Sequence, residues 1–204
     1  QEINELSIKN NNLRDDIVLS LIRTLELFDH YTGGHSEDVA NISWLIANEM
    51  KLDKDTLSTM YWAGIVHDIG KIGVSADIIN KTTKLTLEEY KKIKEHPIFG
   101  YQILRKSEDL KPIALLVKHH HEWWNGSGYP DGISGDAIPL GSQVLQLADS
   151  LSAMTTKRPY SIVKTKKEIL AEIEMYTGTQ FSPIISEVVV KLINKGNLDF
   201  LFNR

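Results

Sequence analysis

Apolar residues recur at intervals of three and four along most of this chain, and this spacing constrains its fold more than any other feature. The series Val39, Ile42, Ile46 and Met50 is one example, and the same spacing returns in several later segments. Residues spaced in this way lie on one face of an α-helix. No segment has the convincing alternation that is typical of a β-strand. We therefore predict an all-α fold, a compact bundle of about eight or nine helices.

Some of the expected helices have recognisable first residues. Thr86 with Glu89, and Thr165 with Glu168, have the spacing of a capping box, in which each side chain bonds the backbone amide of the other residue. Asp109 precedes a further apolar series and is the expected cap of that helix. These residues predict where three helices begin.

The segment 122–138, EWWNGSGYPDGISGDAI, does not follow the helical pattern. It contains four glycines, one proline, two tryptophans and one tyrosine. Loops of this length in compact domains are usually functional or disordered. The aromatic residues argue against disorder, so we predict a long, ordered and functional loop.

The N-terminal segment has a spacing of its own. Its apolar positions follow one another at intervals of 3, 4, 3 and 4, which is the seam of a coiled coil with one polar core residue. A linker helix with frayed ends is the alternative, because three consecutive asparagines are poor helix formers. We predict an N-terminal helix within 1–27 and a catalytic domain over 28–204; a coiled coil would allow a homodimer. The seam consists of Ile3, Leu6, Asn10, Leu13 and Ile17.

Composition excludes several classes of protein. The chain has 204 residues, 42% hydrophobic and 25% charged, which is enough apolar material for a folded core. Its formal net charge of −4 argues against DNA as a partner. No apolar run approaches the roughly 18 residues of a membrane span, and the N-terminal segment is too polar for a signal peptide. We therefore expect a cytoplasmic protein without a membrane span.

Cysteine is absent, so disulfides, thiolate zinc sites and cysteine nucleophiles are excluded. Any metal must be held by His, Asp and Glu. His67 and Asp68 end a strongly apolar helix, where burying a carboxylate is costly unless a positive charge pairs with it. Lys71 is one candidate partner of Asp68, and a metal ion is the other.

Further histidines and one aspartate are expected to point inward. His119, His120 and His121 form a run that we expect on a helix, and successive helical residues point about 100° apart, so at most two can address one site. His120 and His121 continue the apolar face, while His119 is expected at the rim. His35 lies in line with a buried series, and Asp149 lies within an apolar helix.

Inward imidazoles and carboxylates on separate helices predict a two-metal centre. Without thiolates, the ligand set suits Fe, Mn, Zn or Ni. Two ions about 3.5–4 Å apart need a bridging carboxylate, and Asp68 is placed to supply it. Such a pair activates water and neutralises charge on a phosphoryl oxygen, so the predicted chemistry is phosphoester hydrolysis.

These residues together resemble the HD-GYP subgroup of the HD metal-dependent phosphohydrolase superfamily. The resemblance covers about residues 28–195. It implies an all-helical fold, a binuclear or trinuclear metal site, and hydrolysis of cyclic di-GMP to pGpG, with GMP as a further product. The motifs are DHYTGGHSEDVA (29–40), HDIGKIGV (67–74), EHPIFGYQIL (95–104), HHHEWWNGSGYPDG (119–132), LADSLSAMTTKRPY (147–160) and GTQFSP (178–183).

The resemblance also implies roles for individual residues. Asp68 and Lys71 are the implied catalytic residues, Lys71 and Arg158 would contact phosphate, and Tyr129 and Pro130 would shape the substrate wall. His96, which alone would be read as a surface residue, joins the ligands. The implied metal ligands are His35, His67, Asp68, His96, His120, His121 and Asp149.

Three positions depart from the family pattern. Asn125 and Ser152 each replace an aspartate that is common in the family, and Asp149 is retained beside the second. Tyr31 stands where trinuclear members have a glutamate, so we expect two divalent ions, Fe or Mn before Zn or Ni.

The main hypothesis is a cyclic di-GMP phosphodiesterase that forms the output domain of a longer signalling protein. One alternative is a catalytically weak cyclic di-GMP receptor whose GYP loop engages signalling partners. The other is an HD hydrolase that acts on a different nucleotide.

Overall fold

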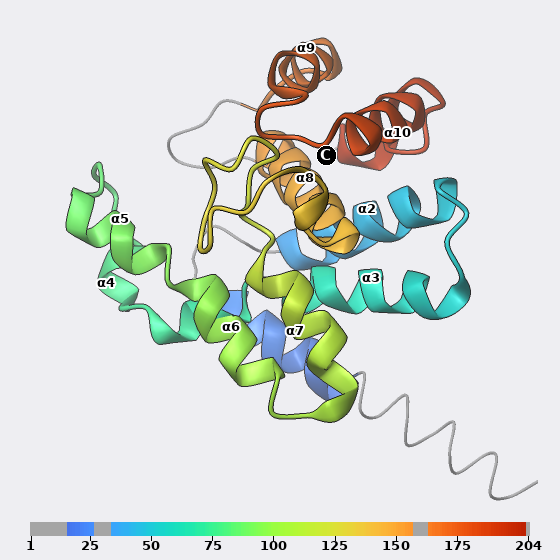
Figure 1. Ribbon diagram of the computed structural model, residues 1–204. Helices are drawn as coiled ribbons and strands as arrows, with labels where there is room; N and C mark the ends of the chain where they lie inside the picture. Colours follow the sequence, from blue (N-terminus) through green and yellow to red (C-terminus); the bar gives the residue numbers. More distant parts are fainter. Residues whose placement is uncertain (1–15, 27–33, 157–162, 203–204) are drawn as a thin grey trace, which may run out of the picture.

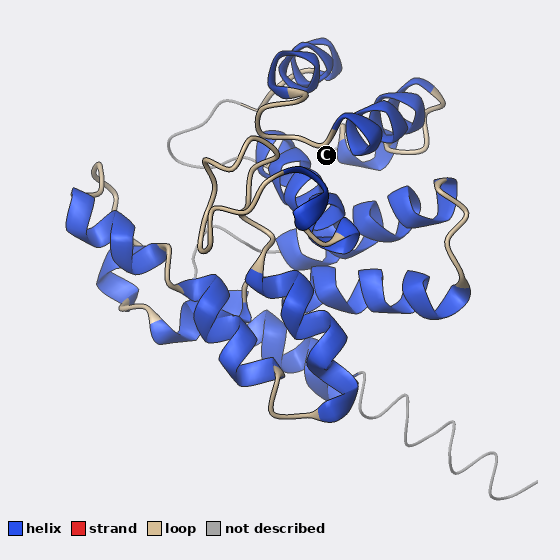
Figure 2. Cartoon of the chain, in the orientation of Figure 1, coloured by secondary structure: helices blue, strands red, loops and turns tan. Residues whose placement is uncertain are grey.

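The computed structural model describes residues 16–26, 34–156 and 163–202, which form helices joined by loops (Figure 1). Within this part of the chain the only β-type pairing is an isolated bridge between Thr177 and Phe181 (Figure 2). The predicted all-α fold is confirmed. Residues 16–26 are helical. The α-helices that follow among the described residues are α2 (His35–Glu49), α3 (Lys54–Val66), α4 (Ala76–Ile79), α5 (Leu87–Ile93), α6 (His96–Leu104), α7 (Lys111–Lys118), α8 (Leu140–Thr155), α9 (Lys166–Tyr176) and α10 (Pro183–Asn194).

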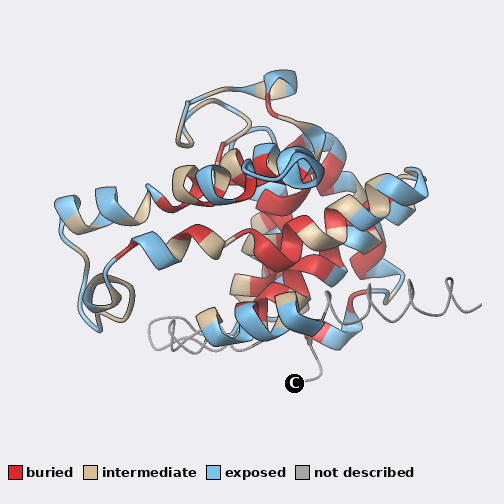
Figure 3. Ribbon diagram, turned by 90° about the horizontal axis from the view of Figure 1, so that it is seen from below, coloured by how far each residue is buried: buried red, intermediate tan, exposed pale blue. Residues whose placement is uncertain are grey.

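The centre of the bundle is formed by α2, α3 and α8, with α7 and α10 packed around them (Figures 1 and 3). Their inward faces supply fully buried side chains such as Ile42, Ile65 and Leu147. The helices α2 and α3 approach closely at Gly64, where a Cβ atom would lie 2.4 Å from the Cα of Ala40. The apolar series predicted from the sequence therefore form one continuous core.

A second close approach joins the turn after α3 to α6. This turn is the 3₁₀ helix η1 (Ile69–Gly73), and a Cβ on Gly70 would lie 1.9 Å from the carbonyl oxygen of His96 and 2.5 Å from the amide nitrogen of Gly100. Only glycine permits backbones to meet at this distance. The contact places Asp68, the residue before η1, beside the first residue of α6.

Both predicted capping boxes are present, at Thr86 for α5 and at Thr165 for α9. The prediction that Asp109 caps α7 was wrong, because the residue before that helix is Leu110 and no side chain caps it. Asp109 lies in a 3₁₀ turn (Glu108–Leu110) that runs directly into α7. Pro112 also removes one of the first amide donors that a cap would satisfy.

The loop 122–138 is ordered, as predicted, and lies against the segment between α9 and α10. The amides of Trp124 and Asn125 donate to the carbonyls of Gln180 and Thr179, at 3.1 and 2.9 Å. Gly128 lies so close to the preceding turn that a Cβ would be 2.2 Å from the amide nitrogen of Trp123. The loop is therefore held from two sides.

None of the helices in the described ranges is both long and apolar enough to cross a membrane. The predicted coiled-coil seam lies almost wholly in residues 1–15, outside the described residues, and the same holds for Tyr31 and Arg158. The division into 1–27 and 28–204 therefore stays a prediction.

Candidate metal centre

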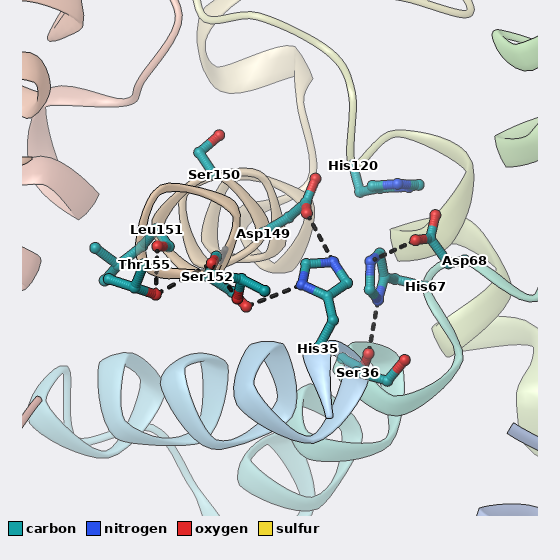
Figure 4. A network of polar contacts seen from close by, with 12 residues as sticks. His35, Ser36, His67, Asp68, His120, Asp149, Ser150, Leu151, Ser152 and Thr155 are labelled. Carbon is teal, nitrogen blue, oxygen red and sulfur yellow. Dashed lines mark hydrogen bonds and ion pairs between the residues drawn. The ribbon is translucent and has the colours of Figure 1, made fainter. Parts of the chain in front are cut away.

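The predicted ligand residues come from five separate places in the chain, and the fold brings all of them together. His35 and His96 are the first residues of α2 and α6, His67 and Asp68 follow α3 directly, and His120 and His121 come one residue after the end of α7. Asp149 projects from the middle of α8 toward His35 (Figure 4). Most of these side chains are buried in the bundle, and the two aspartates are half-buried. They form two groups of three whose ligand atoms all lie within 4.8 Å of one another. The groups are His35, His67 and Asp68, and His96, His120 and His121.

Asp68 joins the two groups. Its Oδ2 lies 3.3 Å from Nε2 of His67, and its Oδ1 lies 3.3 Å from Nε2 of His96. Asp149 completes the first group, with Oδ1 3.1 Å from Nε2 of His35. One carboxylate oxygen directed at each group is the arrangement that a bridging ligand of two metal ions requires.

Backbone carbonyls orient three of the imidazoles. Nδ1 of His67, His96 and His120 lies 2.7, 2.8 and 2.6 Å from the carbonyl oxygen three residues earlier. A carbonyl only accepts, so each Nδ1 carries a hydrogen, and in the neutral ring the lone pair is on Nε2. Metal-ligating histidines commonly donate their other ring N–H in this way.

Two further observations fit a metal. Nε2 of His67 is buried and makes no hydrogen bond, and the Asp68 carboxylate lies 3.3 Å away, so a cation at this position would satisfy both groups. Nε2 of His96 lies 3.4 Å from Nε2 of His120, and two lone pairs this close gain from a shared cation. Nitrogen and carboxylate donors without thiolate suit borderline divalent ions. The residues present fit divalent metal ions, and the donor set leaves their identity open.

The electrostatics of the site favour positive charge. Burial favours the neutral acid, but Lys71 and His67 outweigh it and hold the pKa of Asp68 well below its usual range. Burial alone would lower the pKa of His67, but Asp68 and Asp149 outweigh it and raise that pKa to about 9. The carboxylates thus remain charged and attract a cation, which divalent metals would supply.

The second group consists of histidines alone and contains no carboxylate. Burial, reinforced by the neighbouring histidines, lowers the pKa of His120 well below its usual value and that of His121 to about 3. Burial likewise lowers the pKa of His96. All three rings are therefore neutral near pH 7, the form that binds metals.

Lys71 forms an ion pair with Asp68, with Nζ 2.8 Å from Oδ2. The sequence offered two partners for this carboxylate, Lys71 and a metal ion, and the structure contains the lysine. The other carboxylate oxygen, Oδ1, still faces the second group. Lys71 lies on η1 and its side chain is partly exposed, so its ammonium group borders the site.

Tyr129 of the loop lies beside the second group, and Pro130 follows it in the chain. The Tyr129 ring stacks on His121, with centroids 4.8 Å apart, and its amide donates to the His121 carbonyl at 3.1 Å. Burial raises the pKa of Tyr129, so its phenol is neutral. The bond from Tyr129 to Pro130 is cis. Arg158 belongs to the undescribed residues, so its predicted phosphate contact stays a prediction.

The prediction for the histidine run needs correction. The helix α7 ends at Lys118, so His119, His120 and His121 follow the helix in a turn and do not lie on it. His119 is only 6% exposed and does not line a rim, because it lies 3.7 Å from the buried Glu122. His120 and His121 nevertheless lie together with His96 in the second group.

Sequence reasoning missed two residues that support the site. Oε1 of the buried Glu122 accepts hydrogen bonds from the amides of Asp131 and Gly132, at 2.7 and 3.1 Å, and so ties the loop to the end of the histidine run. Ser152 Oγ lies 2.9 Å from Nδ1 of His35 and orients that ring. Glu122 directly follows the three histidines, and that position was the signal that could have identified it.

Comparison with known proteins agrees with this architecture. A family model described as "HD domain" matches residues 20–185. The chain belongs to the HD domain family. A solved structure titled as an HDG"Y"P protein from Bdellovibrio bacteriovorus has a similar fold, with a TM-score of 0.63 and 15% identity over 78% of this chain and 51% of that one.

Curated relatives share about a third of their residues with the chain. A "Cyclic di-GMP phosphodiesterase" of Thermotoga maritima is 35% identical over 87% of this chain and 50% of the relative. The "Cyclic di-GMP phosphodiesterase response regulator RpfG" of Xanthomonas campestris pv. campestris is 34% identical over 80% and 44%. The "3'3'-cGAMP-specific phosphodiesterase 3" of Vibrio cholerae is 33% identical over 87% and 39%. The chain spans half or less of the length of these relatives.

The crystal structure of a cyclic GMP-AMP-specific phosphodiesterase of V. cholerae has the same fold. It has a TM-score of 0.71 and 20% sequence identity over 89% of this chain and 49% of that one.

Proposed function

We propose that this chain hydrolyses a phosphodiester bond of cyclic di-GMP and releases linear pGpG, with two divalent metal ions held by its histidine and aspartate cluster. The observation that carries the proposal is Asp68, whose two oxygens face two separate groups of buried ligands. The names of the curated relatives supply the substrate class. A further step from pGpG to GMP uses the same chemistry.

In this proposal His35, His67 and Asp149 would hold one ion, the three remaining histidines would hold the other, and Asp68 would serve both. Iron and manganese are the first candidates for this donor set, with zinc and nickel as alternatives. When bound, the two ions lower the pKa of a water molecule and neutralise charge on the phosphoryl group.

The chain's own residues then position the substrate. Water adds to phosphorus, the bond from phosphorus to the ribose 3′ oxygen breaks, and that oxygen takes up a proton. Lys71 borders Asp68, and its ammonium group donates to a phosphate oxygen or assists the proton transfer to the leaving oxygen. Tyr129 and Pro130 form a wall beside the second ion site, and Arg158 grips phosphate through its planar guanidinium.

A second substrate has support from a specific observation. Three relatives from V. cholerae are named as specific for 3′3′-cGAMP, at 33%, 30% and 31% identity. This dinucleotide has the same phosphates and one different base, so the metal centre would treat both alike. A cyclic di-GMP receptor with weak catalysis is the remaining alternative. Cytoplasmic location, a homodimer through the N-terminal helix and signalling partners stay predictions from the sequence.

The test combines metal analysis with an assay. Protein purified without oxygen and loaded with Fe(II) or Mn(II) should contain two ions per chain and convert cyclic di-GMP to pGpG, as separated by chromatography. Asp68→Asn keeps the shape of the side chain, removes the bridging charge, and should lose both paired metal and turnover. Wild-type protein with two ions and no release of pGpG or of the corresponding cGAMP product would overturn the enzyme proposal.

A further inference from the structure

A lysine ammonium group lies between two tyrosine rings at the edge of the metal centre, and none of the roles described above accounts for it. Nζ of Lys94, the residue that ends α5, lies 4.8 Å from the ring centroid of Tyr90 and 4.8 Å from that of Tyr129. Tyr129 in turn stacks on His121. A line of contacts therefore runs from α5 across the loop to the second ligand group.

The charge of Lys94 is not balanced nearby. It is half-buried and makes no ion pair with a carboxylate in the described part of the chain, whereas Lys91 on the same helix pairs with Glu88 at 2.8 Å. Two ring faces attract an ammonium group only weakly, and a half-buried cation close to a site for two divalent ions is repelled by them. This position is favourable when an anion binds beside the lysine.

We propose that Lys94 contacts a phosphate of the bound cyclic dinucleotide, and that this is the phosphate that is not cleaved. This inference rests on the proposed function and deepens it. Lys71 borders Asp68 and serves the reacting phosphate, while Lys94 lies one aromatic ring beyond His121, on the side of the loop. A cyclic dinucleotide carries two phosphates, and in this proposal Lys71 serves the reacting one and Lys94 the other, in addition to the phosphate contact predicted for Arg158.

A contact remote from the reacting atoms is made equally in the ground state and the transition state. Its loss therefore raises Kd and KM and leaves kcat nearly unchanged. Removing a hydrogen bond to a charged group weakens binding roughly tenfold to a hundredfold. Because Lys94 is partly exposed, we expect its removal to weaken binding about tenfold. Because the contact is between charges, its contribution falls as salt rises.

The experiment measures binding separately from turnover. Metal-loaded protein is titrated by calorimetry with the bis-phosphorothioate analogue of cyclic di-GMP, at low and high salt. The variants are Lys94→Gln, Lys94→Arg and the control Lys92→Gln, which removes the same charge from an exposed position on the same helix. Turnover of cyclic di-GMP and metal content are measured on the same samples.

We expect Lys94→Gln to raise Kd and KM about tenfold at low salt and less at high salt, with kcat and metal content close to wild type. Lys94→Arg should bind within about threefold of wild type, since it keeps the charge and the ring contacts. Lys92→Gln should behave as wild type.

The outcomes separate the two proposals. Equal Kd values for wild type and Lys94→Gln overturn the Lys94 contact even if turnover is normal. A loss of affinity that does not depend on salt also overturns it, because it assigns Lys94 to an uncharged base edge. Binding that depends on Lys94 without any turnover supports the contact and overturns the enzyme proposal. Wild-type protein that neither binds nor hydrolyses the dinucleotide overturns both.

Discussion

Adding one methyl group at Gly70 tests whether the close approach of η1 and α6 builds the metal centre. The Cβ of Gly70→Ala would lie 1.9 Å from the His96 carbonyl oxygen and 2.5 Å from the Gly100 amide nitrogen, both backbone atoms. Ordinary contact is about 3.5 Å, so relieving the 1.9 Å approach requires the turn and the helix to separate by about 1.6 Å. Overpacking costs about 1–3 kcal/mol, and we expect the upper end because no side chain can move aside.

The same displacement separates Asp68 from His96, which lie 3.3 Å apart and belong to different ligand groups. A misplacement of about 1 Å can reduce catalysis by about a hundredfold. We therefore expect Gly70→Ala to lower the free energy of unfolding by about 3 kcal/mol, measured by denaturant titration of metal-free protein. The loaded protein should hold less than two ions per chain.

Gly73→Ala is the matched control, because it adds a methyl group within the same turn. Its Cβ would lie 2.6 Å from the ring of Phe99, a side chain that can rotate. This variant should lose less than about 1 kcal/mol and keep its metal. If Gly70→Ala matched this control in both stability and metal content, the argument that the backbone contact sets the distance between the two ligand groups would be refuted.

Three further predictions concern other parts of the molecule. Lys71→Ala and Arg158→Ala should each lower kcat/KM about tenfold to a hundredfold with two ions still bound, because each removes a charged phosphate contact but no ligand; unchanged kinetics in both would exclude them from the site. Glu122→Ala leaves two loop amides without their acceptor and should cost about 2–3 kcal/mol of unfolding free energy, whereas Glu122→Gln keeps an acceptor oxygen and should cost less. Hydrogen bonds from two lysines of α10 and its cap lower the pKa of Glu49 to about 2, so the stability it contributes is present above about pH 4.5 and is lost as the pH falls toward 2; Glu49→Gln should flatten the acid limb of the stability profile in that window, and an identical limb would contradict this.

Much of the architecture was predictable because it depends on short-range pattern. The series containing Val39, Ile42 and Ile46 is fully buried on α2, and both capping boxes start helices as expected. Asp109 was mispredicted because a 3₁₀ turn runs directly into α7, and such a turn has no signal in the apolar spacing.

The candidate site was predictable to a different degree for each residue. His67 with Asp68 and Asp149 could be singled out because polar groups inside apolar helices need a partner. His96 could not be singled out from the sequence around it, because it lies among charged residues at the start of a helix and would be read as a surface residue. Only the family resemblance pointed to it. Glu122 accepts hydrogen bonds from amides within its own loop, and Lys94 contacts the ring of Tyr129, which is distant in the sequence; the apolar spacing gives no signal for either contact.

The sequence by itself therefore determined the helices, the absence of thiolate ligands and the types of donor available, because periodicity and residue chemistry are local properties. Only the tertiary structure decided that the donors form two groups with Asp68 between them. It also decided that His120 and His121 reach the site from a turn after α7. The physical reason is that these distances depend on how closely separate backbones approach, as at Gly70 and His96, and that approach is set by packing between segments rather than by the pattern within any one of them.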